Sequence, residues 1–188
     1  PRPCCCASAA TAPLAQAAGV KTLFAQISGD LLLDVLIGAL FAVLSYSSLA
    51  VVLLVATLAS LGIIGLPVAL GLVLGANLGS GLLGMLSTLH AEPEARRVTL
   101  GNFLFKLIGC ALAIPRIAHV AALVPRTGLS PANAVVLFHL AFNLILAVLF
   151  LGFTNPIARL AERLLPSPPA TDDPSRPRHL DPSALDTP

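Results

Sequence analysis

Two apolar runs, each too short to cross a membrane, meet at a group of hydroxyl side chains in this sequence. The first run, Leu31 to Leu44, has 14 residues, and the second, Leu49 to Leu61, is of similar length. A hydrocarbon core about 30 Å thick needs about 20 helical residues, whereas runs of about 10 to 14 are typical of re-entrant or buried segments. The pair is joined at Ser45-Tyr46-Ser47-Ser48, and it therefore predicts a helical hairpin that enters the membrane and returns.

The composition indicates a membrane protein. Hydrophobic residues make up 56% of the chain and charged residues 11%, against about 25% charged residues in soluble domains. The net charge of +2 is small and the basic residues are scattered, so the sequence predicts no nucleic-acid partner. It contains no zinc-ligand spacing and no Ser/His/Asp constellation, and we therefore expect neither a zinc site nor an enzyme.

The next apolar segment, Leu66 to Leu89, is long enough to span a membrane but is rich in glycine. It holds five glycines, and Asn77 lies near its centre. Each glycine costs a helix about 1 kcal/mol relative to alanine, so we expect the backbone to unwind between Gly75 and Gly81. Broken helices of this kind build the substrate and ion sites of many transporters. Glycines spaced four apart are also typical of tight helix packing in lipid, and this alternative stays open.

These motifs resemble the repeat of the bacterial sodium/phosphate cotransporter family. In that family each of two inverted repeats has a Gln-Ser-Ser-Ser hairpin tip and a downstream Gly-Ala-Asn-Ile-Gly-Thr-Thr motif. The matching positions are Ser47, Ser48, Gly75, Ala76, Asn77 and Gly79. The departures are Ser45, Tyr46, Ser80 and Gly81. The resemblance covers roughly residues 31–166, and this chain looks like the second of the two repeats.

The resemblance implies sodium-dependent phosphate symport, with this chain forming one repeat of the transport site. The implied fold is an all-α membrane protein, an inverted-repeat half with a re-entrant helical hairpin, a broken helix and two further transmembrane helices. The implied substrate and ion ligands are Ser47, Ser48, Gly75, Asn77, Gly79 and Ser80, with sodium near Ser47, Ser48 and Asn77. The altered tip leaves open a transporter or channel for another small anion. A membrane scaffold or regulatory subunit is a further alternative.

Two polar pairs lie on the later apolar helices, and the members of each pair share one helix face because they are four residues apart. The pairs are Asn102 with Lys106 in the run 98–114, and His139 with Asn143 in the run 131–153. A lysine within a membrane segment is by default a functional hypothesis, although its long side chain can also reach the membrane surface. We expect accessory roles at the site for Ser45, Lys106, His139 and Asn143.

The sequence divides into four parts. We expect an irregular or interfacial segment over 1–29, a membrane transport domain over 30–153, an amphipathic interfacial helix over 154–166 and a proline-rich disordered linker over 167–188. The last residues resemble the segment that leads into the cytoplasmic PhoU-like domain of these transporters. Because the chain begins with Pro1 rather than methionine, we expect a fragment that lacks the first repeat and the PhoU-like domain.

Charged residues predict how the protein lies in the bilayer. The arginines after Leu89 and those after Phe153 are two spans apart, so the positive-inside rule places both groups in the cytoplasm. Asp34, one turn into its apolar run, is expected at the membrane interface rather than buried. The resemblance implies a multi-pass protein of the inner (plasma) membrane.

Overall fold

The computed structural model describes residues 30–166, and it contains helices and no strand within that range. The helices are α3 (Leu31–Leu44), α4 (Ser48–Ser60), α5 (Leu66–Ser87), α6 (Pro93–Ala113), the 3-10 helix η1 (Ile114–Arg116), α7 (Ile117–Thr127), α8 (Pro131–Leu151) and α9 (Thr154–Leu164). The predicted all-α class is therefore confirmed. The predictions of an irregular segment over 1–29 and a linker over 167–188 lie outside the described residues.

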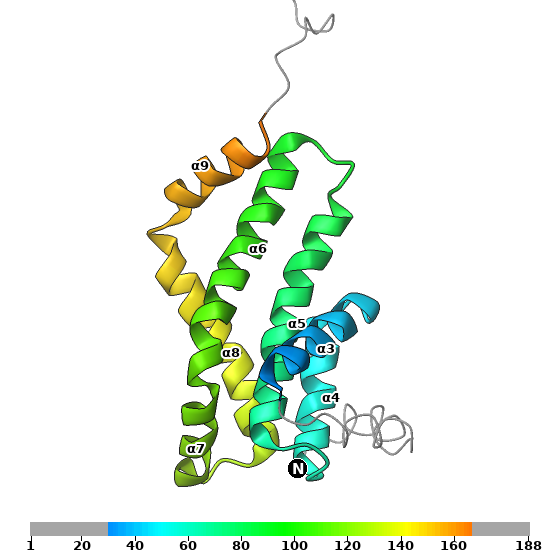
Figure 1. Ribbon diagram of the computed structural model, residues 1–188, viewed down its shortest axis with the longest axis vertical. Helices are drawn as coiled ribbons and strands as arrows, with labels where there is room; N and C mark the ends of the chain where they lie inside the picture. The colour runs from blue at the N-terminus through cyan, green and yellow to red at the C-terminus, as the bar shows by residue number, and fades with distance from the viewer. Residues whose placement is uncertain (1–29, 167–188) are drawn as a thin grey trace, which may run out of the picture.

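The long helices stand side by side along the molecule (Figure 1). Helices α5 and α6 are joined at the top by the loop over 88–92, α7 continues α6 at the bottom, and α9 lies across the top. Helix α3 packs mainly against α5, and α4 packs against both α5 and α8. We call the end with α9 and the α5–α6 loop the charged end.

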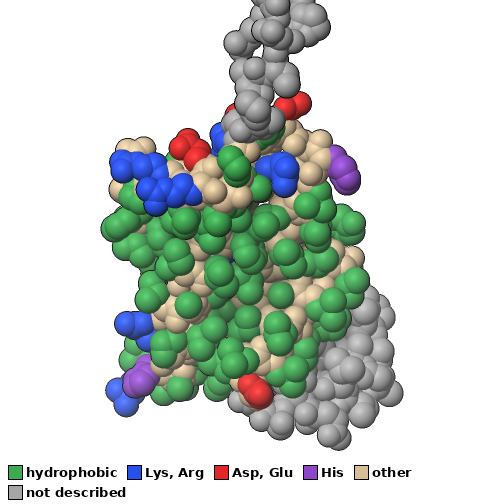
Figure 2. All heavy atoms as spheres, turned by 45° about the horizontal axis from the view of Figure 1, so that its top comes forward, with side chains coloured by type: hydrophobic (Ala, Val, Ile, Leu, Met, Phe, Trp, Pro, Cys, Tyr) green, Lys and Arg blue, Asp and Glu red, His purple; other side chains and the backbone are tan. Residues whose placement is uncertain are grey.

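Three stretches are long and apolar enough to cross a membrane: Leu66–Ser87, Pro93–Thr127 and Pro131–Leu151. Their outward faces are apolar, and on α8 the exposed side chains include Leu140, Leu144 and Val148. Figure 2 shows a broad hydrophobic surface with charged side chains gathered at its ends. This distribution is that of a protein surrounded by lipid. Two of the three candidate spans follow the glycine-rich segment, where the sequence predicts two further transmembrane helices.

The two half-length helices that the sequence predicts are present as α3 and α4. The Asp30 side chain accepts hydrogen bonds from the backbone N–H groups of Leu32 and Leu33 at the start of α3, and Ser47 caps α4 by accepting from the Ala50 N–H. Between the helices, Tyr46 adopts a left-handed backbone conformation with φ of 53°. Such a conformation is costly for a residue with a side chain, and here it reverses the chain within a few residues.

Helix α5 is continuous from Leu66 to Ser87, so the predicted break between Gly75 and Gly81 is wrong. Gly75 and Gly79 lie against the backbone of α3 instead, and Gly81 faces Phe103 of α6. A Cβ added to Gly75 would collide with the Val35 carbonyl oxygen. A helix satisfies its own backbone groups, which is a strong requirement at membrane depth, and the close contact with α3 compensates for the weak helix propensity of glycine.

The amphipathic helix predicted over 154–166 is present as α9, which lies at the charged end. Arg97, at the start of α6, donates from Nε to the Leu165 carbonyl oxygen over 2.9 Å. The same arginine lies 3.9 Å from a carboxylate oxygen of Glu94. The arginines of α6 and α9 thus share one end of the molecule, as the sequence predicts.

Candidate functional site

Polar side chains from three helices meet near the midpoints of those helices. Helix α5 contributes Asn77 and Ser80, α6 contributes Lys106, and α8 contributes His139 and Asn143. We call this group the mid-span cluster. Its members come from the predicted break motif and from the two predicted polar pairs, which the sequence could not connect to one another.

Asn77 is the centre of the mid-span cluster and is only 1% exposed. Its Nδ2 donates to the Val73 carbonyl oxygen over 3.0 Å and lies 3.1 Å from His139 Nδ1. Asn143 Nδ2 donates to Asn77 Oδ1 over 2.8 Å and to the His139 carbonyl oxygen over 2.8 Å. These bonds hold α8 to α5, so the amide has a structural role in addition to any contact with a ligand.

Lys106 brings a positive charge to the mid-span cluster. Its Nζ donates to Ser80 Oγ over 2.7 Å, and Ser80 Oγ donates to the Asn77 carbonyl oxygen over 2.8 Å. Within residues 30–166 no carboxylate lies within ion-pair distance of this ammonium. A charged group at mid-depth is costly unless it is compensated, so Lys106 suits an anion as its partner.

Lys106 lines a groove of about 320 Å³ between α6, α8 and the start of α9. Asn102 and Asn143 line the same groove, so its polar wall carries one ammonium group and two amides. A second cavity, of about 540 Å³, shares Asn102 with the first and reaches Arg97 at the charged end. The two cavities thus lie next to each other, one lined by Lys106 and the other by Arg97 at the charged end.

The hairpin tip lies apart from the mid-span cluster. Ser45 Oγ lies 2.7 Å from the Phe41 carbonyl oxygen and 3.0 Å from the Ser47 carbonyl oxygen, while Ser47 Oγ accepts from the Ala50 N–H over 3.2 Å. In the described part of the chain, no hydrogen bond joins Ser45, Ser47 or Ser48 to Asn77 or Ser80. The structure therefore assigns helix-end roles to Ser45 and Ser47. A ligand role for the tip stays a prediction.

The remaining predicted ligands, Gly75 and Gly79, face α3 rather than the groove. Ideal Cβ atoms built on them would meet the carbonyl oxygens of Val35 and Ala39. Because α5 is a regular helix, its backbone groups at these glycines belong to the helix, and the positions of Gly75 and Gly79 fit close packing. The break motif thus divides into a packing face with the glycines and a polar face with Asn77 and Ser80.

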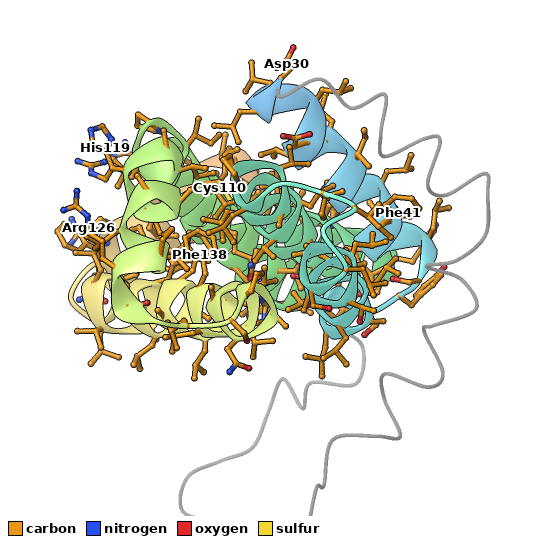
Figure 3. The ribbon with its side chains drawn as sticks, turned by 90° about the horizontal axis from the view of Figure 1, so that it is seen from below. Asp30, Phe41, Cys110, His119, Arg126 and Phe138 are labelled. Atoms are coloured by element: carbon orange, nitrogen blue, oxygen red, sulfur yellow. The ribbon has the colours of Figure 1, made fainter. Side chains whose placement is uncertain are left out.

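Two further side chains show how the interior is arranged. Cys110 is 2% exposed and its Sγ donates to the Leu74 carbonyl oxygen over 3.5 Å, so it behaves as a small buried residue. Figure 3 shows Cys110 and Phe138 directed into the interior between the helices. Phe138 is partly buried and packs against the apolar core that contains Cys110.

The sequence predicts Asp34 at the membrane interface rather than buried, whereas the structure buries its side chain within the protein. The side chain is 1% exposed and packs against Gly71 of α5. The spacing of Asp34 and Gly38, four residues apart, could have indicated burial, because residues four apart share one helix face. Gly38 approaches the backbone of Leu72 so closely that an added Cβ would collide with it. Asp34 therefore lies on the most closely packed face of α3.

Comparison with known proteins identifies the family of the chain. The family model described as Na+/Pi-cotransporter matches residues 8–153. Over 179 residues, or 95% of the chain, the sequence is 50% identical to an Escherichia coli K12 protein named "Putative inorganic phosphate export protein YjbB". A Salmonella typhimurium protein with the same name is 49% identical over 179 residues. The chain spans only 33% of the length of these relatives.

A more distant relative comes from Bacillus subtilis. It is named "Uncharacterized protein YqeW" and is 30% identical over 132 residues, which cover 70% of this chain and 43% of that protein. No solved structure matches the chain.

Proposed function

The chain belongs to the Na+/Pi-cotransporter family, and from this premise we propose that the protein moves inorganic phosphate across the inner (cytoplasmic) membrane. In this proposal the chain forms one repeat of the transport site, and the mid-span cluster is its part of the phosphate site. The observation that carries the proposal is the ammonium group of Lys106, which lines a groove at mid-depth and has no carboxylate within ion-pair distance in the described part of the chain.

The chemistry of the groove suits a phosphate ion. Lys106 can donate up to three hydrogen bonds, and the amides of Asn102 and Asn143 add neutral donors. Hydrogen bonds from a cationic donor to an oxyanion are roughly twice as strong as those between neutral groups. A groove of about 320 Å³ also leaves room for an ion of this size and for some of its water.

We further propose that sodium drives the movement, as the description of the family implies. The predicted sodium ligands are neutral oxygens of Ser47, Ser48 and Asn77. In this structure the two serines lie at the hairpin tip and Asn77 in the mid-span cluster. A shared ion would require these groups to approach one another, or oxygens from the remaining part of the full-length protein.

The direction of transport follows the gradients across the membrane. The relatives from Escherichia coli and Salmonella typhimurium carry names that refer to phosphate export. In this proposal phosphate passes between Lys106 and the side that the positive-inside rule makes cytoplasmic by way of the two neighbouring cavities, which share Asn102 in their walls. One site can serve uptake or export, because a secondary transporter exposes the same site to each side in turn.

The full-length protein in sealed vesicles tests the proposal. Radiolabelled phosphate is followed into empty vesicles and out of loaded vesicles, each with sodium or with choline as the cation. We expect saturable phosphate flux that arsenate inhibits and chloride does not, and a faster rate with sodium. Flux of other anions with no preference for phosphate would favour a different anion transporter. No flux above that of protein-free vesicles would favour the scaffold alternative.

A further inference from the structure

Asp34 has a buried carboxyl group that the mid-span cluster does not use. It lies in the first turn of α3 and is 1% exposed. Its Oδ1 is buried and has no hydrogen-bond partner in the structure. An ionised carboxylate in apolar surroundings is very costly unless a cation compensates it. The group must therefore be neutralised while α3 is packed as it is here.

The surroundings of Asp34 on α5 are apolar and fitted closely to it. A Cβ added to Gly71 would lie 2.9 Å from Asp34 Cβ and 3.4 Å from Asp34 Oδ2. The same added atom would lie 2.9 Å from Cδ1 of Leu31. Only a glycine at position 71 therefore leaves room for the carboxyl group between the two helices.

No described cation compensates the Asp34 carboxylate. The helices that pack against α3 are α4 and α5, and neither contains an acidic, basic or histidine residue. The other acidic residue at the start of α3 is Asp30, whose Oδ1 accepts from the N–H groups of Leu32 and Leu33. On α7, His119 and Arg126 point away from α3 (Figure 3).

We infer that Asp34 binds a proton: its carboxylate takes the proton up from water to become a neutral carboxylic acid, and the acid returns the proton to water when α3 separates from α5. A proton fits this position better than a sodium ion. Transporter sites for sodium use unwound backbone carbonyls as ligands, whereas α3 and α5 are unbroken beside Asp34. A proton needs no further ligand.

The contact between α3 and α5 then has two states, one with the Asp34 proton bound and one without it. With the proton bound, the neutral side chain remains packed against Gly71. Without the proton, the charged carboxylate requires water, which it can reach only if α3 moves away from α5. Loss of the proton would therefore separate α3, the first helix of the hairpin, from α5. The link between this proton and phosphate movement rests on the proposed function, whereas the proton site itself does not.

The test compares Asp34→Asn with Asp30→Asn in the full-length protein. Both variants replace one carboxyl group at the start of α3 by a neutral amide, and asparagine caps a helix about as well as aspartate. In vesicles we expect the rate of phosphate flux to vary with pH in the wild type and in Asp30→Asn. In Asp34→Asn the rate is expected to vary less with pH than in Asp30→Asn, which keeps the pH dependence that phosphate itself contributes.

A second measurement needs no transport. The melting temperature of the purified protein is recorded against pH without phosphate, with and without sodium. If the folded protein holds the Asp34 proton more firmly than the unfolded chain, the wild type loses stability relative to Asp34→Asn as pH rises. This result in a protein that moves no phosphate would support the proton site and contradict the proposed function.

Three outcomes would overturn the inference. The first is a difference in melting temperature between the wild type and Asp34→Asn that does not change with pH. The second is a stabilisation by sodium at constant pH that only the Asp34→Asn variant loses, which would make the occupant sodium. The third is failure of both Asp34→Asn and Asp34→Ser to fold while Asp34→Glu folds, because the charge would then be paired within the full-length protein.

Discussion

Lys106 Nζ donates to Ser80 Oγ over 2.7 Å, and this bond joins α6 to α5 near the middle of both helices. Ser80 Oγ donates a hydrogen bond to the Asn77 carbonyl oxygen, so a lone pair of the hydroxyl accepts from the ammonium. The position of Ser80 is that of the first threonine in the family motif. A hydroxyl at this position therefore orients a cation that belongs to the protein itself.

The charge of Lys106 is expected to decide phosphate affinity. Replacing Lys106 by methionine keeps much of the side-chain length and removes a charge-assisted hydrogen bond worth about 1.5 to 3 kcal/mol, so the half-saturation concentration for phosphate should rise about tenfold or more. Lys106→Arg keeps the charge and should transport with a smaller change. The melting temperature should not fall in Lys106→Met, because an apolar side chain replaces a half-buried cation. Normal phosphate kinetics in Lys106→Met would remove the lysine from the site.

Asn77→Leu is expected to abolish transport while the protein still inserts into the membrane. The leucine deprives Asn143 and His139 of their partner on α5. A double-mutant cycle with Asn77→Ala and Asn143→Ala measures their coupling, which we expect near the average of about 0.6 kcal/mol for hydrogen bonds between membrane helices. Transport at the normal rate by Asn77→Leu, measured in vesicles, would show that the amide is dispensable.

The glycine face of α5 is expected to tolerate no side chain at Gly75. In Gly75→Ala the new Cβ would collide with the Val35 carbonyl oxygen, so α3 has to move. Gly84→Ala is the matched control, since its nearest neighbour is the Cγ2 atom of Thr99 at 3.9 Å, and alanine is favoured over glycine in a helix by about 1 kcal/mol. We expect a lower melting temperature and lower yield for Gly75→Ala, and an equal or higher melting temperature for Gly84→Ala. Equal stability of the two variants would argue against the close contact of α3 with α5.

The two tip serines are expected to respond differently to alanine. Ser47→Ala removes the cap of α4 and should cost about 1 kcal/mol in stability. Ser48 lies in the first turn of α4 and does not serve as its cap, so Ser48→Ala should leave the melting temperature unchanged. If the tip binds phosphate or sodium, Ser48→Ala raises the half-saturation concentration for that ion in vesicle assays. Unchanged kinetics in Ser48→Ala, together with lower stability in Ser47→Ala, would make the tip structural.

The sequence by itself determined the helices and their approximate ends. Apolar runs between polar turns predict α3, α4 and α8, and the capping residues Asp30 and Ser47 act on their nearest neighbours in the chain. The polar pairs on α6 and α8 follow from a spacing of four residues. All of these features are local, because helix periodicity and capping depend on residues within a few positions of one another.

Only the tertiary structure decided whether the glycine-rich segment breaks. Local propensity favours unwinding near Gly75, but the contact with the α3 backbone over Val35 compensates for that cost, and α5 stays whole. The same contact buries Asp34 against Gly71, which its distance from the end of the run did not predict. The meeting of Asn77 with Asn143 likewise joins residues far apart in the chain. Burial and polar contact of this kind depend on which helix lies opposite, and a sequence pattern describes the faces of one helix at a time.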